Sequence, residues 1–289
     1  MTYTIDSQVH AYSADTPDRP WKNKPNWPKH VTGDEMLAAM DAVGVDGAIL
    51  ISAYSIYKFD DSYALEVQNA YPNRFALVKL IDPSNPESAT ITSNLKKTRG
   101  MVGIRILMNH CPERGPDDPN IALILRTAAR HDLPVNILFW DRLDISADLI
   151  DRFPDTRFII DHMGIKQPHK PPAPADPFAE LPMVLNLAKR PNTYIKISGA
   201  CTLSHVGYPY PDIWDPLCRV FDAWGIERCL WGTDWTRASA VLSYEQGVTP
   251  FRLIDCLTES ERTMLMGGTC ADIYGWEPIS KAKYVSSNP

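Results

Sequence analysis

The chain has 289 residues and a formal net charge of −6 at pH 7, with a pI near 5.6 and no long basic run. This balance argues against nucleic acid or an anionic membrane as a partner. No apolar run reaches the ~18 residues of a membrane span, and the first residues lack the regions of a signal peptide. We therefore expect a cytoplasmic protein that acts on a small molecule, with a homodimer as the default assembly.

Eight short apolar runs recur along the chain, with helical patterns such as residues 33–44, 118–132 and 146–155 between them. The runs cover residues 3–11, 47–52, 75–81, 102–108, 134–139, 158–164, 194–199 and 229–235. This alternation predicts a parallel sheet covered by helices, and eight units in under 300 residues favour a single-domain (β/α)8 TIM barrel over residues 1–289. A Rossmann-type sheet is disfavoured because no glycine-rich turn follows the first run.

The first run, IDSQVHAY, alternates polar and apolar residues. Side chains two apart in a strand share a face, so Asp6, Gln8 and His10 are expected to point together into the barrel. Polar groups at this place are more typical of a site than of a core.

Catalytic groups in such barrels lie at the carboxyl ends of the strands and in the loops that follow. Two of these loops, residues 11–33 and 165–178, are long and proline-containing, and we expect them to wall a pocket. The strand ends offer, in chain order, Gln8, His10, Tyr54, Lys79, Arg105, Asn136, Asp161, His162, Lys196 and Asp234.

The six cysteines are widely scattered, with no C-x-x-C spacing and no secretory context. This argues against a disulfide framework and a zinc cluster, so we expect the thiols to be reduced.

Five motifs carry a resemblance to a known family: IDSQVHAY, GIRIL, IIDHMG, WGTDW and the closing MGGTCADIYGW. Their order and spacing over the whole chain resemble the amidohydrolase superfamily, in particular its amidohydrolase-2 branch of lactonases and decarboxylases. The resemblance implies a (β/α)8 barrel. It also implies that the first strand usually carries H-x-H, which binds a divalent metal together with later His and Asp residues.

This chain departs from that pattern, because Gln8 stands at the first histidine position and only His10 remains. The fifth strand shows no lysine for carbamylation, and the seventh offers Lys196 where a metal site would want histidine. An amide oxygen replaces imidazole poorly on zinc, and an ammonium beside a dication is unfavourable. We therefore expect no metal cofactor, as in the relatives of 2-pyrone-4,6-dicarboxylate lactonase that work without one. The alternative is zinc or manganese held by His10, His162 and Asp234.

The resemblance implies a hydrolase that opens a small, carboxylated lactone of a catabolic route. Asp234 would be the general base, with His10 and His162 stabilising the oxyanion. The remaining expected substrate-binding residues are Gln8, which would orient His10 or the water, together with Arg105, Lys79, Lys196, Tyr54, Trp235 and Arg237.

Each assignment has a structural alternative. Asp234 could cap a helix, His10 could bond a backbone carbonyl, and Arg105 could close an internal salt bridge. At the level of function, the alternatives are a metal-dependent decarboxylase or amide hydrolase of the same superfamily, and a binding protein on an inactive barrel.

Overall fold

A computed structural model describes residues 3–25 and 27–279. In these residues eight parallel strands form one sheet in the order β1 to β8. Their bounds are β1 Ile5–Val9, β2 Gly47–Ile51, β3 Phe75–Leu80, β4 Met101–Leu107, β5 Val135–Leu138, β6 Phe158–Ile160, β7 Thr193–Lys196 and β8 Cys229–Leu230. All eight overlap the predicted runs, which confirms the α/β barrel.

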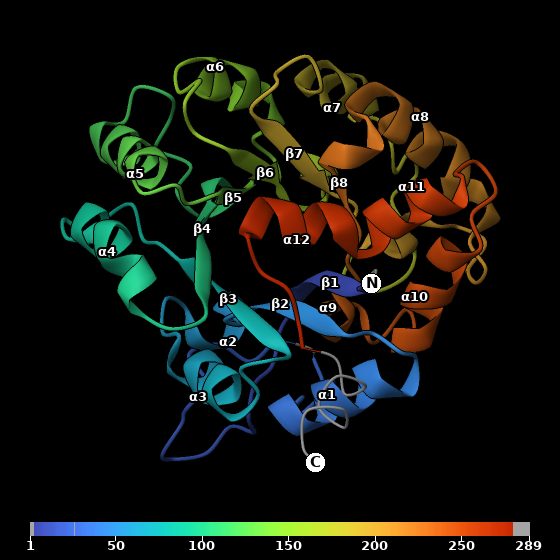
Figure 1. The fold of residues 1–289 in the computed structure, drawn as a ribbon, viewed down its shortest axis with the longest axis horizontal. Coiled ribbons are helices and arrows are strands. Elements are labelled where there is room, and N and C mark those ends of the chain that lie inside the picture. Colours follow the sequence, from blue (N-terminus) through green and yellow to red (C-terminus); the bar gives the residue numbers. More distant parts are fainter. Residues whose placement is uncertain (1–2, 26, 280–289) are drawn as a thin grey trace, which may run out of the picture.

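Helices follow the strands and ring the sheet (Figure 1). The α-helices are α1 Gly33–Ala42, α2 Tyr54–Tyr57, α3 Ser62–Ala70, α4 Ser88–Asn94, α5 Pro119–Arg130, α6 Ser146–Asp151, α7 Leu181–Leu187, α8 Trp214–Trp224, α9 Trp235–Ala238, α10 Tyr244–Arg252, α11 Glu259–Thr263 and α12 Thr269–Tyr274. Short 3-10 or π segments are η1 Leu95–Lys97, η2 Met108–His110, η3 Leu143–Ile145, η4 Asp161–Gly164, η5 Ala200–Leu203, η6 Pro211–Ile213, η7 Ile226–Arg228 and η8 Met264–Gly268. None of the helices within the described residues has the length and hydrophobicity to cross a bilayer.

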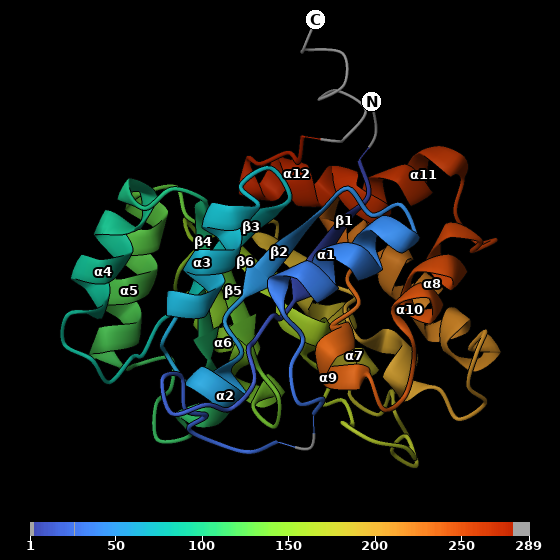
Figure 2. The ribbon, with the colours of Figure 1, turned by 90° about the horizontal axis from the view of Figure 1, so that it is seen from below.

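The two ends of the barrel carry different elements. Helices α11 and α12 cover one end, whereas α2 and α9 lie at the other, where the strands finish (Figure 2). Within the described residues no strand ladder pairs β8 with β1, and two backbone hydrogen bonds join this seam instead. The amide of Ser7 donates to the carbonyl of Trp231 at 3.1 Å, and that of Asp234 donates to the carbonyl of Gln8 at 3.0 Å.

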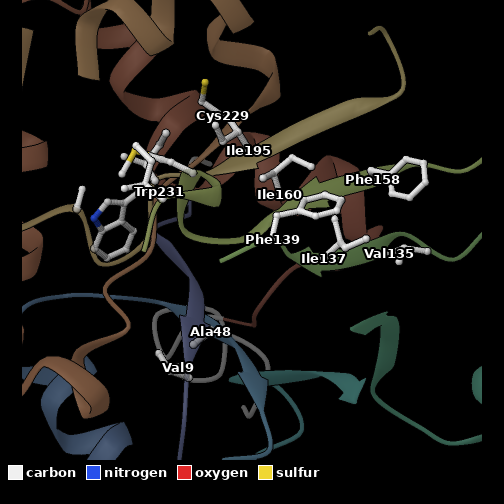
Figure 3. Packing of buried hydrophobic residues seen from close by; sticks show 14 of the residues in the cluster. Val9, Ala48, Val135, Ile137, Phe139, Phe158, Ile160, Ile195, Cys229 and Trp231 are labelled. Carbon is white, nitrogen blue, oxygen red and sulfur yellow. The ribbon is translucent and has the colours of Figure 1, made fainter. Parts of the chain in front are cut away.

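Alternation along the strands sorts the core into two clusters. In β2, Ala48 and Leu50 face the helices, while Ile49 and Ile51 face the barrel interior. The outer cluster contains the strand residues of Figure 3, among them Val9, Ile137 and Ile160. Burying both faces explains why the strands read as continuous apolar runs.

The prediction that Asp6 shares the inward face with Gln8 and His10 is wrong. The pairing of β1 with β2 slips by one residue between Asp6, opposite Ala48, and Val9, opposite Leu50. A bulge adds one residue to a strand, so two residues that simple alternation would put on the same face lie on opposite faces when the bulge is between them. Asp6 therefore points outward, where its carboxylate accepts from the amide and hydroxyl of Thr233 and, at 3.2 Å, from the hydroxyl of Tyr244.

The outward position of Asp6 gives stability a pH dependence. Burial raises the pKa of Asp6 from 3.8 to about 6, although its hydrogen bonds oppose the shift. Stability from this group is therefore fully present below pH 3.8 and is lost as pH rises through about 6, by roughly 3 kcal/mol. The side-chain amide of Asn can satisfy the same partners but does not titrate. We therefore expect Asp6→Asn to lose this dependence of stability on pH, which thermal melts at pH 4.5 and 7.5 would measure. An unchanged difference between the two melts would contradict the assignment, and Asp6→Ala should melt lower at both pH values.

The prediction for Lys79 is also wrong. Its side chain leaves β3 on the outer side and pairs with the carboxylate of Asp61, in a surface hollow beside Leu65 and Ile91. The neighbouring residues Val78 and Leu80 belong to the interior cluster. A shift of one position along β3 thus decides whether a side chain lies inside the barrel or on its outer surface.

The expectation that all cysteines are reduced fails for one pair. Cys218 of α8 and Cys256, after α10, form a disulfide across 38 residues of sequence, with their Cα atoms 6.5 Å apart. Spacing along the chain could not reveal this proximity, because it arises from the tertiary packing of α8 near the segment after α10, with β8 and α9 between them in the sequence. The other four, Cys111, Cys201, Cys229 and Cys270, are free and buried.

Candidate active site

The strand ends bring a set of polar side chains to the mouth of the barrel, all at most 6% exposed. They are Gln8 and His10 from β1, Arg105 from β4, Asp161 and His162 after β6, Lys196 from β7, and Asp234 and Arg237 after β8. So many buried ionisable groups require partners, because an unpaired charge in a core is costly.

Asp234 lies at the centre of this set. Its Oδ2 accepts from Nε of Arg237 and lies 3.7 Å from Nδ1 of His162, while its Oδ1 lies 3.3 Å from Nε2 of His10. Oδ1 is buried and makes no well-oriented hydrogen bond with the described residues. Burial raises the pKa of Asp234, but Arg237, His162 and His10 together lower it well below 3.8. The carboxylate is therefore ionised, with one oxygen available to a substrate or water.

The two histidines differ in their hydrogen bonding. Nδ1 of His10 lies 2.8 Å from the carbonyl of Ile51, which can only accept, so Nδ1 carries the proton and Nε2 is the atom that faces Asp234. In His162, Nδ1 lies 2.9 Å from the hydroxyl of Ser198, and Nε2 lies 3.3 Å from Nη2 of Arg105. Burial and the nearby arginines lower the pKa of His162 to about 3, so this ring is neutral and its Nε2 accepts from Arg105.

A chain of alternating charges runs under the mouth. Nε of Arg105 donates to Oδ2 of Asp161 at 2.6 Å, and Nζ of Lys196 lies 3.2 Å from Oδ1 of the same residue. Lys196 also donates to Oε1 of Gln8 at 2.8 Å, and the amide nitrogen of Gln8 lies 3.4 Å from Nε2 of His10. Burial raises the pKa of Asp161, but the two cations lower it to about 2. Lys196 and Gln8 thus link the Arg105–Asp161 pair to His10.

The backbone holds the two central residues in an uncommon conformation. His162 has φ 52° and ψ 36°, and Asp234 has φ 50° and ψ 32°, both in the left-handed region. Non-glycine residues there cost roughly 1–3 kcal/mol and cluster at functional sites. At Asp234 the seam supplies the restraint, because its amide donates to Gln8 and the preceding amide, of Thr233, donates to Asp6.

Both long loops place side chains against these groups. Trp27 stacks on His10 with ring centroids 6.2 Å apart. From the other loop, Gln167 accepts from Nη2 of Arg237 at 2.7 Å. Trp140, after β5, lies 5.3 Å from the ring of His162 and 5.4 Å from the guanidinium carbon of Arg237. The mouth is therefore roofed by aromatic rings.

Not every predicted residue joins this cluster. Tyr54 begins α2 at the rim, where its ring packs against the interior cluster and against His110. Trp235 contacts Tyr244 and the outer cluster. Lys79 is outside the barrel, as described above.

Several contributing residues were missed or given no role. Trp140 and Ser198 are the second residues after β5 and β7, so the rule that site residues follow strand ends also predicts them. Asn136 was among the strand-end residues but was given no role, and its side-chain oxygen accepts from the hydroxyl of Tyr274 of α12 deep in the barrel. Gln167 lies in a loop whose path the sequence did not predict.

A family model described as Amidohydrolase matches residues 5–276. The chain belongs to this amidohydrolase family. The resemblance predicted from its motifs is confirmed.

Curated relatives of this amidohydrolase are lactone hydrolases at low identity. A 4-sulfomuconolactone hydrolase of Rhizobium radiobacter is 27% identical over 80% of this chain and 74% of its own length. An L-fucono-1,5-lactonase of Burkholderia ambifaria is 25% identical over 81% of each chain.

Solved structures share the fold. A protein from Acinetobacter baumannii, described as a probable 2-pyrone-4,6-dicarboxylic acid hydrolase with citric acid bound, superposes with a TM-score of 0.75 at 18% identity, over 94% of this chain and 99% of that one. An amidohydrolase from Burkholderia multivorans with bound zinc gives a TM-score of 0.74 at 22% identity, over the same shares.

The residues of this chain fit a divalent metal poorly. Among the described residues, no three His, Cys, Asp or Glu side chains are arranged to hold one. Both ring nitrogens of His162 are engaged, and the guanidinium groups of Arg105 and Arg237 and the ammonium of Lys196 surround the carboxylates that a metal would need. A dication there would face three cations at short range.

Proposed function

We propose that this amidohydrolase hydrolyses a small lactone that carries an anionic substituent, with Asp234 as general base and no metal ion. The observation that carries the proposal is the free Oδ1 of an ionised, buried Asp234, 3.3 Å from Nε2 of His10. The lactone hydrolases among its relatives support the reaction type.

The reaction follows from these positions. A water molecule hydrogen-bonded to Oδ1 of Asp234 loses a proton to it as its oxygen attacks the lactone carbonyl carbon. The tetrahedral oxyanion forms beside the cationic side chains, and the guanidinium of Arg105 is the donor best held for it, because Asp161 and His162 fix its Nε and Nη2. The ring C–O bond then breaks, and Asp234 returns the proton to the leaving alkoxide, which gives a hydroxy acid.

The role that we propose for His162 differs from the one expected from the sequence. A neutral ring whose Nε2 accepts from Arg105 cannot donate to an oxyanion from that atom. We assign His162 to positioning Arg105 and Asp234. His10 faces the attacking water with Nε2, which lies near the side-chain amide of Gln8, and Lys196 in turn donates to Gln8. An ester is a suitable substrate for such a site, since its alkoxide leaves more readily than an amine.

The test is hydrolysis of a lactone panel by protein stripped with a chelator. The panel pairs carboxylated five- and six-membered lactones with neutral sugar lactones, and acid release is followed near neutral pH. We expect turnover of at least one carboxylated lactone that neither the chelator nor added zinc changes by more than about twofold. Lactone turnover that appears only after zinc or manganese is added would overturn the metal-free mechanism in favour of metal-dependent hydrolysis. No lactone turnover with or without metal would favour the metal-dependent decarboxylase or amide hydrolase, to be assayed on its own substrates.

A further inference from the structure

One surface lysine at the rim has a backbone conformation that normally requires glycine. Lys58 has φ 56° and ψ −123°, and the amide of Asp60 donates to the carbonyl of Tyr57 at 3.1 Å. These values match the second position of a type II′ turn, where glycine is strongly preferred because a Cβ is strained. Strained residues of this kind persist only where the surrounding structure holds them, and they cluster at functional sites.

The turn lies over the carboxyl end of the barrel. It follows β2, whose last residue, Ile51, binds His10 through its carbonyl. Tyr54, three residues before the turn, and Phe59, its third residue, both pack against the interior cluster. The backbone of the turn that carries Lys58 is thus held at this end of the barrel.

The ammonium of Lys58 and the ring of His110 both lie close to the ring of Tyr54. Its Nζ lies 4.6 Å from the ring centroid of Tyr54, and the ring of His110 lies 4.5 Å from that centroid. His110 ends η2, directly after the strand that carries Arg105. Burial, Lys58 and Arg105 all lower the pKa of His110, which places this ring within electrostatic range of both cations.

The charge of Lys58 is not neutralised by the protein. Within residues 3–25 and 27–279 it forms no ion pair, whereas Lys79, Lys166 and Lys196 each pair with an aspartate. Burial and then the charge of Asp82 raise the pKa of Tyr54, and the Asp82 carboxylate accepts from the amide of Ser84. The rim therefore offers an unmatched ammonium next to an imidazole.

We propose that Lys58 and His110, gathered on Tyr54, form a rim subsite that binds the anionic substituent of the substrate, a carboxylate or a sulfonate. The inference rests on the proposed lactone hydrolysis and adds the residues that select the substrate. Arg105 then serves the reacting end, and Lys58 the distal end. A charge-assisted hydrogen bond at this place lowers KM for the anionic substrate without changing the chemistry at the carbonyl.

The experiment compares two lactones with the same ring, one bearing a carboxymethyl group and one the corresponding carboxamide. We expect Lys58→Gln to raise KM for the carboxylate about tenfold with kcat nearly unchanged, and to leave the amide unaffected. Lys58→Arg should retain the preference. Lys97→Gln is the matched control for net charge, because Lys97 is exposed in η1 just before β4, at the opposite end of the barrel.

A second variant separates charge from backbone strain. Lys58→Gly should show the same loss of preference and melt about 2–4 °C higher, since relief of one strained residue is worth of the order of 1 kcal/mol in a domain of this size. Equal effects on both lactones, or none on either, would overturn the subsite. A Lys58→Gly protein that melts lower would overturn the strain argument.

Failure of the proposed function would show differently. If the unmodified protein hydrolyses neither lactone, calorimetric titration with the ring-opened hydroxy dicarboxylate and its amide still measures the subsite. About tenfold weaker binding of the dicarboxylate to Lys58→Gln, with unchanged binding of the amide, would support the anion site alone. Equal binding of the dicarboxylate to both proteins would reject it.

Discussion

Replacing Asp234 by Asn is expected to reduce kcat for lactone hydrolysis by at least about 1,000-fold while the protein stays folded. The amide has nearly the same shape, but it cannot take a proton from water. Its carbonyl oxygen can still accept from Nε of Arg237, so that contact survives. Single-turnover and steady-state rates, with circular dichroism to verify the fold, make the measurement.

The pH profile provides an independent check on Asp234. Because its pKa is lowered, the carboxylate stays ionised as pH falls through the ordinary carboxyl range near 3.9. The acid limb of kcat/KM assigned to this residue therefore lies below that range, and activity that depends on its ionised form is lost only there.

An Asn variant with more than a tenth of the original kcat would remove Asp234 from the mechanism.

Replacing Lys196 by Met is expected to cost about 3–5 kcal/mol of unfolding free energy and to lower the melting temperature by about 5–15 °C. Met has a similar length, so the cost comes from charge and not from a cavity. Asp161 would keep only Arg105 as a cationic partner, and Oε1 of Gln8 would lose its donor. Burial of Lys196 is complete, and no solvent can replace the ammonium.

Lys79→Met is the matched control for this prediction. That ion pair with Asp61 is about one-fifth exposed on each side, and such pairs contribute about 1 kcal/mol or less. Thermal melts of the two variants should therefore differ clearly. If Lys196→Met and Lys79→Met had the same melting temperature, the ammonium of Lys196 could not be a required link between Asp161 and Gln8.

The order of elements was predictable because the buried strands of a parallel barrel are apolar runs that alternate with helical patterns along the sequence. Strand ends also placed His10, Arg105, His162, Lys196 and Asp234 together, since the carboxyl ends of parallel strands meet at one end of the barrel. Their chemical roles remain predictions.

What could not be predicted depends on single-residue register and on contacts between distant segments. The bulge in β1 turned Asp6 outward, and an error of one position put Lys79 on the wrong face. The Cys218–Cys256 disulfide and the contact of Gln167 with Arg237 join segments whose proximity no local pattern encodes. Hydrogen-bond direction, which sets the state of His162, likewise requires coordinates.

The seam between β8 and β1 has a consequence for how the enzyme would fail. Here β8 is only two residues long, and the barrel is joined by the amides of Ser7 and Asp234 and by the carboxylate of Asp6. Local opening begins where few backbone bonds hold an edge, well below the free energy of global unfolding. Because Asp234 lies on that edge, we expect mild denaturant to displace it, and to abolish the hydrolysis proposed above, before the protein unfolds.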